Sequence, residues 1–138
     1  MSTPFADIPL ALIAAYRAGL FFSDADTVYP NAAFIKPANS VTPWCRLDHI
    51  PTQPDSLSMD SNEHTGFLQL SLMYPLNTGN AGAWAKADEV SAYFRAGSRF
   101  VYDGQVVQIV STGASGTLTD NGFMMTPITI QYRAFAER

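Results

Sequence analysis

The stretch EHTGFLQLSLMYP, residues 63–75, alternates between large apolar residues and smaller or polar ones. Successive side chains of a β-strand point to opposite faces of a sheet, so this alternation predicts a strand with one face buried. The inward residues are expected to be Leu68, Leu70, Leu72 and Tyr74, and the outward residues Phe67, Gln69, Ser71 and Met73. A strand with one apolar face needs partner strands, and the rest of the chain supplies them.

The segment FMMTPITIQYRAF, residues 123–135, alternates in the same way and predicts a closing strand. Its inward residues are expected to be Met124, Thr126, Ile128, Ile130 and Tyr132. Pro127 has no backbone N–H to donate to a ladder, which indicates an edge or bulged position.

A hairpin is predicted at RFVYDGQVVQIV, residues 99–110. Asp103 and Gly104 both tolerate the positive φ that a type I′ turn requires. The Gly- and Ser-rich stretch STGASGTLTDNG, residues 111–122, is expected to form a loop or a ragged hairpin. PWCRLDHI, residues 43–50, also alternates and predicts a further strand, and TVYPNAAFIKP, residues 27–37, a short strand followed by an extended segment.

Two helices are predicted, one in each half of the chain. The first runs from about residue 5 to 20, capped by Asp7, with Pro9 in its first turn and Gly19 as a left-handed cap. The second ends at Gly97, and its apolar face is expected to carry Ala83, Trp84, Ala87, Val90, Ser91 and Phe94. The order of elements predicts a single α+β domain over residues 1–138, a mainly antiparallel β-sheet with two α-helices packed on one face.

Composition excludes several classes of function. The 138 residues carry a net charge of −4 and no cluster of Lys and Arg, which argues against a nucleic-acid-binding face. Residues 1–64 hold seven acidic and three basic residues, so the negative charge lies in the first half. The apolar run 8–22 is interrupted by Arg17, and neither a membrane span nor a secretory signal fits. The single cysteine excludes an internal disulfide. We expect a soluble protein.

Cys45 and His49 are the residues most suggestive of chemistry. They share a face of one predicted strand but are four positions apart, roughly 13 Å, too far for a catalytic dyad or for two ligands of one metal ion. His64 opposite His49 would still give only a two-ligand site. TGASG, residues 112–116, lacks the Lys and the following helix of a phosphate-binding loop. We therefore expect no enzyme, no cofactor and no metal.

Two surfaces are candidates for binding other proteins. The outward faces of the two best strands are neutral where a solvated sheet commonly carries Lys and Glu, which suits packing against a copy of itself; an ordinary Ser/Thr-rich surface is the alternative. This candidate subunit or tube interface comprises Gln69, Ser71, Thr129, Gln131 and Arg133. The acidic stretch PTQPDSLSMDSN, residues 51–62, is expected to be a loop that is either mobile or ordered by a partner. Its candidate binding residues, with the residue that follows it, are Asp55, Ser56, Leu57, Met59, Asp60 and Glu63.

The succession of these segments resembles the tail terminator family of long-tailed bacteriophages over roughly residues 5–135. The residues that carry the resemblance are VYPNAAFIKP (28–37), PWCRLDHI (43–50), HTGFLQLSLMYPLNTG (64–79), a helix ending in YF (93–94), RFVYDGQVVQIV (99–110) and ITIQYRAF (128–135). The match lies in their order and spacing, and none of them is a catalytic motif.

The resemblance implies a structural virion protein. Six copies would form a homo-hexameric ring at the head-proximal end of the tail, contact the tail tube protein and the head-tail connector proteins, and stop tube polymerisation. The protein would be made in the host cytoplasm, with no membrane association and no sequence-specific nucleic acid contact. Another tail or neck component of the same fold, a tube or connector subunit, is the main alternative. A small enzyme or ligand-binding module around Cys45, His49 and His64 is the other.

Overall fold

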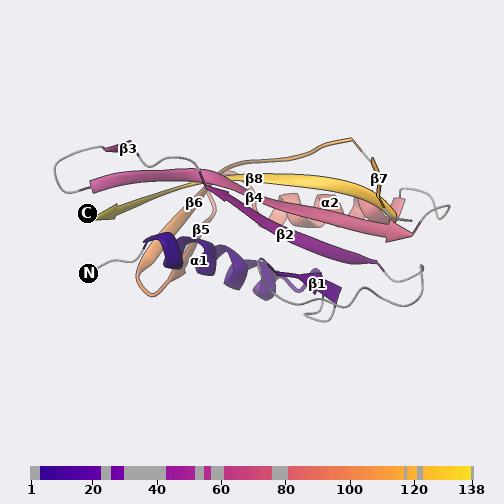
Figure 1. Ribbon diagram of the computed structural model, residues 1–138, viewed down its shortest axis with the longest axis horizontal. Coiled ribbons are helices and arrows are strands. Elements are labelled where there is room, and N and C mark those ends of the chain that lie inside the picture. The colour runs from indigo at the N-terminus through magenta and orange to yellow at the C-terminus, as the bar shows by residue number, and fades with distance from the viewer. Residues whose placement is uncertain are drawn as a thin grey trace.

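The computed structural model describes residues 4–22, 26–29, 43–51, 55–56, 61–75, 81–116, 118–120 and 123–137. Its elements follow one another along the chain as in Figure 1. They are α1 (Pro4–Gly19), β1 (Thr27–Val28), β2 (Trp44–Pro51), β3 (Asp55–Ser56), β4 (Ser61–Pro75), α2 (Ala81–Tyr93), β5 (Arg99–Tyr102), β6 (Gln105–Ala114), β7 (Leu118–Asp120) and β8 (Phe123–Glu137).

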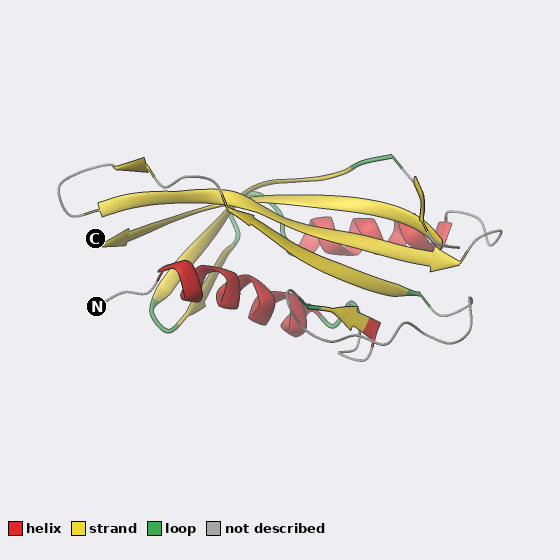
Figure 2. Cartoon of the chain, viewed as in Figure 1, coloured by secondary structure: helices red, strands yellow, loops and turns green. Residues whose placement is uncertain are grey.

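One sheet organises the molecule, with the strand order β1-β2-β4-β8-β6-β5. The long strands β4 and β8 pair along their whole length, from Ser61 opposite Glu137 to Pro75 opposite Phe123, and they span the molecule in Figure 2. β3 adds to β4 and β7 adds to β8. The described strand pairs are antiparallel apart from β1 with β2, and both helices bury their apolar stripes on one side of the sheet, which confirms the predicted α+β class.

The core forms on the side of the sheet that the helices cover, which we call the inner face. Leu68, Leu70 and Leu72 of β4 are almost fully buried there, as the alternation of residues 63–75 predicts. Tyr74 is only partly buried and packs against the same cluster. The rest of the core comes from strands and helices distant in sequence. It includes Ile8, Leu12 and Tyr16 of α1, Ala87 and Val90 of α2, Val107 and Ile109 of β6, and Ile128, Ile130 and Tyr132 of β8.

The ends of α1 differ from the prediction. The helix begins at Pro4, so Asp7 lies within its first turn, where the helix dipole favours an acid, and does not cap it. At the other end Leu20, with φ of 56°, adopts the left-handed conformation expected of Gly19. A glycine is needed at position 19 for packing instead, because the Phe21 ring occupies the space that a Cβ at this position would fill.

The second helix buries Ala83, Ala87 and Val90 as predicted, and Phe94 just after it. Trp84 does not join them: its side chain is 58% exposed, so its predicted place on the apolar face is wrong. Gly97 has the left-handed φ of 90° expected of a helix stop, but α2 ends four residues earlier, at Tyr93.

The hairpin at Asp103 and Gly104 is confirmed, with φ values of 49° and 82° between β5 and β6. Beyond it β6 extends to Ala114, and Leu118–Asp120 of β7 pairs with β8, so the described residues of 111–122 favour the ragged hairpin over the loop. β8 is not an edge strand, because it lies between β4 and β6, and Pro127 keeps register with Ser71 without a bulge. On its other side, however, Pro127 lies between the residues of β8 that pair with β6, which end at Ile128, and those that pair with β7, which begin at Met125, so the expected edge position holds locally there. Its carbonyl accepts from the Ser115 N–H, so its missing N–H also faces the β6 side, just beyond the paired residues of β6, and the ladder with β4 is unaffected.

The described residues of the stretch 51–62 lie in strands and not in the predicted loop. Pro51 still belongs to β2, Asp55 and Ser56 form β3 opposite Glu63 and Asn62, and β4 already begins at Ser61. Residues 52–54 and 57–60 lie outside the described part of the chain. The short strand predicted at the start of residues 27–37 is β1, and the extended segment predicted to follow it falls on residues 30–37, which also lie outside the described part.

Candidate interaction surface

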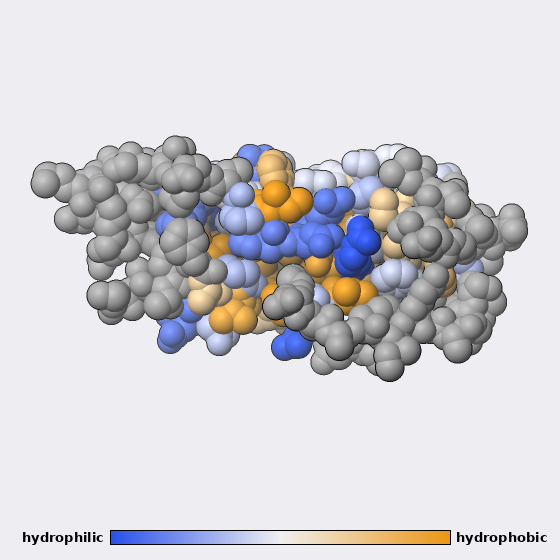
Figure 3. Space-filling view, viewed as in Figure 1, coloured by the Kyte–Doolittle hydropathy of each residue, from blue (hydrophilic) through white to orange (hydrophobic). Residues whose placement is uncertain are grey.

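The outer face of the sheet, away from the helices, carries the residues predicted to bind a partner. β-strand register places Gln69 opposite Thr129 and Phe67 opposite Gln131, so these side chains form adjacent cross-strand rows. Gln69, Thr129 and Gln131 are all partly exposed, and the Ser111 hydroxyl donates to Gln131 Oε1 at 3.2 Å. Figure 3 shows hydrophilic and hydrophobic residues interleaved over the middle of the molecule, where β2 and β4 lie in Figure 1.

Ser71 is the exception within the predicted interface. It is fully buried, and its hydroxyl finds no hydrogen-bond partner within the described part of the chain. Met73 is buried as well, in a small cluster with Trp44 and Phe123. The prediction that the outward residues of β4 are exposed is therefore wrong at Ser71 and Met73, because the outer face has its own apolar cluster at the Pro75 end of the strand.

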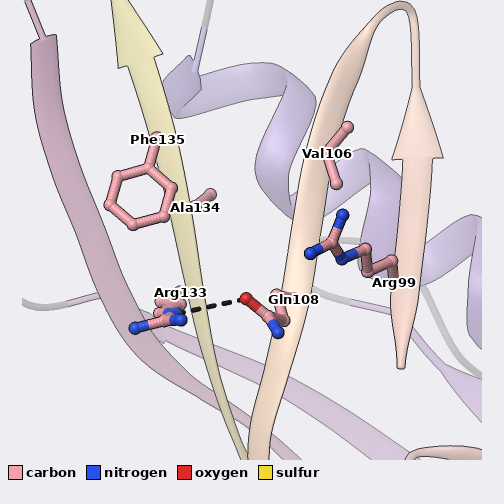
Figure 4. Close-up of a pocket in the computed structure, with 6 residues that line it drawn as sticks. All are labelled: Arg99, Val106, Gln108, Arg133, Ala134 and Phe135. Carbon is pink, nitrogen blue, oxygen red and sulfur yellow. Dashed lines mark hydrogen bonds between the residues drawn. The ribbon is translucent and has the colours of Figure 1, made fainter. Parts of the chain in front are cut away.

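The exposed end of the outer face lies around Arg133. Here a shallow groove of about 250 Å³ opens across three strands, which we call the β5–β6–β8 groove. In Figure 4, Phe135 and Arg133 project from β8, Val106 and Gln108 from β6, and Arg99 from β5. Arg133 Nε donates to Gln108 Oε1 at 3.2 Å, and its guanidinium lies 5.7 Å from the centre of the Phe135 ring.

Of the residues that line this groove, only Arg133 was predicted from the sequence to bind a partner. Arg99, Val106 and Phe135 were missed because each stands in a strand whose alternation reads as ordinary, and nothing in their local spacing shows that three strands bring them together. The strand register brings these residues together, because it places Arg99 opposite Gln108 and Gln108 opposite Arg133.

The acidic candidates are distributed over two strands. Asp55 and Ser56 lie in β3, and Glu63 lies opposite Asp55 in β4. Leu57, Met59 and Asp60 fall outside the described residues.

Cys45, His49 and His64 do not form a site. Cys45 is fully buried in the core, and burial raises the pKa of its thiol to about 12. His49 Nε2 lies 2.6 Å from the Tyr132 hydroxyl, and the two rings stack. His64 is opposite Ala134 on β8, whereas the residue of β4 opposite His49 is Leu68, four positions away. The described residues contain no cluster of three or more His, Cys, Asp or Glu side chains that could hold a metal ion.

The backbone of β2 and the Tyr132 side chain explain why a glycine stands within β4. A Cβ on Gly66 would lie 2.6 Å from the Ile50 carbonyl oxygen, 2.8 Å from Pro51 Cα and 2.8 Å from the Tyr132 hydroxyl oxygen. Gly66 thus allows β2 and the Tyr132 side chain to approach β4 closely, which also brings the Tyr132 hydroxyl to His49.

Comparison with solved structures shows that the fold is shared. One similar structure has a TM-score of 0.67 at 19% identity, with 90% of this chain and 93% of that chain covered. Another is a chain of the virion of a native gene transfer agent particle, with a TM-score of 0.58 at 18% identity and both chains covered in full. Nothing among the curated proteins matches this chain.

The family is shown by the sequence itself. The family model described as phage tail terminator protein matches residues 7–132, so the chain belongs to the phage tail terminator family. It is a structural protein of a phage tail and a component of the virion, where it contacts other tail or head proteins. Neither described helix has the length and hydrophobicity that a membrane crossing demands.

Proposed function

We propose that this chain caps the head-proximal end of the phage tail tube as a ring of six copies, stops tube polymerisation and joins the tail to the head connector. The observation that carries the proposal is the match of the tail terminator family model to residues 7–132. The protein is made in the host cytoplasm, acts in the assembled virion, and has neither a catalytic role nor a cofactor.

The fold provides what such a cap requires. A ring that ends a tube needs a stiff subunit with separate surfaces for its neighbours, the tube and the head. The β4–β8 pair, in register over 15 residues of each strand, gives the subunit a stiff axis. The partly exposed row of Gln69, Thr129 and Gln131 offers a neutral and adaptable surface to the tube or to a neighbouring subunit, and exposed Arg133 adds a positive charge at its end.

The acidic segment that includes Asp55 and Glu63 is proposed to meet the head connector. The excess of acidic residues in the first half of the chain would supply one sign of a complementary contact. A sharp test replaces residues 57–61 with a two-residue Asn-Gly turn, since Ser56 and Asn62, the last pair of β3 with β4, then directly flank the turn and the pairing stays in place. We expect unchanged thermal stability and fewer joined particles. Normal joining by this variant would remove the segment from the proposal.

Termination is tested by electron microscopy of tails made without the protein. We expect tails of irregular length, some much longer than normal, that fail to join heads. Tails of normal and uniform length would contradict termination and would favour a tube or neck subunit of the same fold. Six chains of 15.0 kDa would give a ring of about 90 kDa, which native mass spectrometry of released caps can measure.

A further inference from the structure

The β5–β6–β8 groove combines exposed apolar side chains with two cations. Phe135 is 50% exposed, and Val106 and Val101 beside it are also exposed. Arg99 makes no ion pair with any described residue, and Arg133 contacts a neutral amide and an aromatic ring. Glu63, opposite Phe135 on β4, forms no ion pair with Arg133 in the described structure. The groove therefore suits a partner that presents an apolar side chain together with a carboxylate.

The exposed side of α2 presents that combination. Trp84 is 58% exposed, and Asp88 follows it by four residues, so both lie on one side of the helix. Ala81 and Ala85 are exposed around them. Asp88 makes no ion pair with a described residue, whereas its neighbour Glu89 is paired with Lys86 at 3.2 Å. We call Ala81, Trp84, Ala85 and Asp88 the Trp84 face.

The groove and the Trp84 face cannot meet within one subunit. The groove lies on the outer face of the sheet, and α2 packs on the inner face through Ala87 and Val90. They also lie towards opposite ends of β4. Gly82 sits against Tyr74 near one end, whereas Arg133 is opposite Thr65, and Thr65 is about 33 Å from Pro75 at 3.3 Å per residue. Figure 1 shows α2 and the β5–β6 hairpin displaced from each other along the sheet.

We propose that the Trp84 face of one copy docks into the β5–β6–β8 groove of the next copy. Trp84 packs on Phe135 and Val106, where the guanidinium of Arg133 also offers a cation for its ring, and Asp88 approaches Arg99. Because the two surfaces differ, the contact is head to tail, and its repetition closes a ring when the rotation between copies allows. This inference rests on the proposed ring and names the surfaces that build it.

Trp84 should be the anchor of the contact. Trp and Arg dominate interface energetics when they are buried at the centre of a contact. Trp84→Ala should weaken association between copies roughly 30-fold or more, on the scale of truncating such an anchor. Ala14→Ser, on the exposed side of α1, is the matched control and should leave association unchanged.

The direct test is cross-linking in purified tails with introduced cysteines. Cys45 is fully buried with a raised pKa, so a cysteine placed on the surface is the reactive thiol. Phages carrying Ala85→Cys together with Val106→Cys are treated with a short bis-maleimide and run on a denaturing gel. We expect a ladder from dimer to hexamer. Either single variant should remain monomeric, as should Ala14→Cys combined with Val106→Cys.

Two outcomes would overturn the inference. One is the absence of cross-linking between positions 85 and 106 in tails that contain normal amounts of the protein. The other is a dimer from Ala85→Cys alone, because it would place two copies of the Trp84 face together. Both readouts are separate from tail length, so failure of this contact is distinguishable from failure of the capping function.

Discussion

Gly66 offers the sharpest check on the geometry that places Tyr132 and β2. In Gly66→Ala the new methyl group would lie within 3 Å of three atoms, two of which belong to the backbone of β2. Such overpacking costs about 1–3 kcal/mol, because backbone can move only by disturbing its own ladder. The substitution also reduces the entropy of the unfolded chain, which returns about 0.4–1 kcal/mol. We expect a net loss of about 1–2 kcal/mol of unfolding free energy.

Thermal unfolding followed by circular dichroism measures this loss. For a domain of this size the net cost corresponds to a fall in Tm of roughly 4–8 °C. Gly113→Ala is the matched control: Gly113 also lies in a strand, β6, and a Cβ there meets no atom within 4 Å. The control should leave Tm unchanged or raise it slightly.

A second substitution separates the three contacts. Tyr132→Phe removes the hydroxyl that a Cβ on residue 66 would meet, and with it the hydrogen bond to His49. Gly66→Ala and Tyr132→Phe together should cost less than the sum of the two single changes, because they share one contact. If Gly66→Ala is as stable as Gly113→Ala, the close approach of β2, β4 and Tyr132 is wrong.

Three further predictions concern single residues. Native protein should react with a thiol reagent at Cys45 only after unfolding in urea, since burial removes access and raises the pKa of the thiol to about 12; rapid reaction of folded protein would contradict this. Burial lowers the pKa of His49 and of His64 from 6.5, so below about pH 6.5 the unfolded chain binds protons more readily than the folded protein. Urea unfolding should therefore show stability falling as the pH is lowered from about 7 to about 5.5, less steeply in His49→Gln; an unchanged slope would exclude His49 as a contributor. Gly104→Ala should lose about 1 kcal/mol, because Gly104 has a φ of 82°, and equal stability in urea would argue against the turn.

The strands with strict alternation could be predicted from sequence because the pattern and its physical cause are both local. Leu68, Leu70 and Leu72 reach the core for this reason, and the turn at Asp103 and Gly104 was predictable from its own φ requirements. Alternation decides which face a side chain is on, but it does not decide what covers that face. Ser71 was expected on the surface and is buried, since its face also carries the cluster of Trp44, Met73 and Phe123.

Helix faces and candidate surfaces were harder to predict than strands. Trp84 was assigned to the apolar face of α2 by its hydrophobicity, but Ala83, Ala87 and Val90 already complete the stripe that meets the sheet. The β5–β6–β8 groove depends on the strand order and on the register of β6 with β8, which places Gln108 opposite Arg133. Neither the strand order nor this register is encoded in a short stretch of sequence, because both come from pairing between distant segments.

If this subunit ends the tail tube, the length of tails assembled without it should lose its control. Electron micrographs of tails from a phage that lacks the gene should show a broad distribution extending well beyond the normal length, and tails of normal length should return when the gene is supplied from a plasmid. A narrow distribution centred on the normal length in the absence of the protein would show that another component ends the tube.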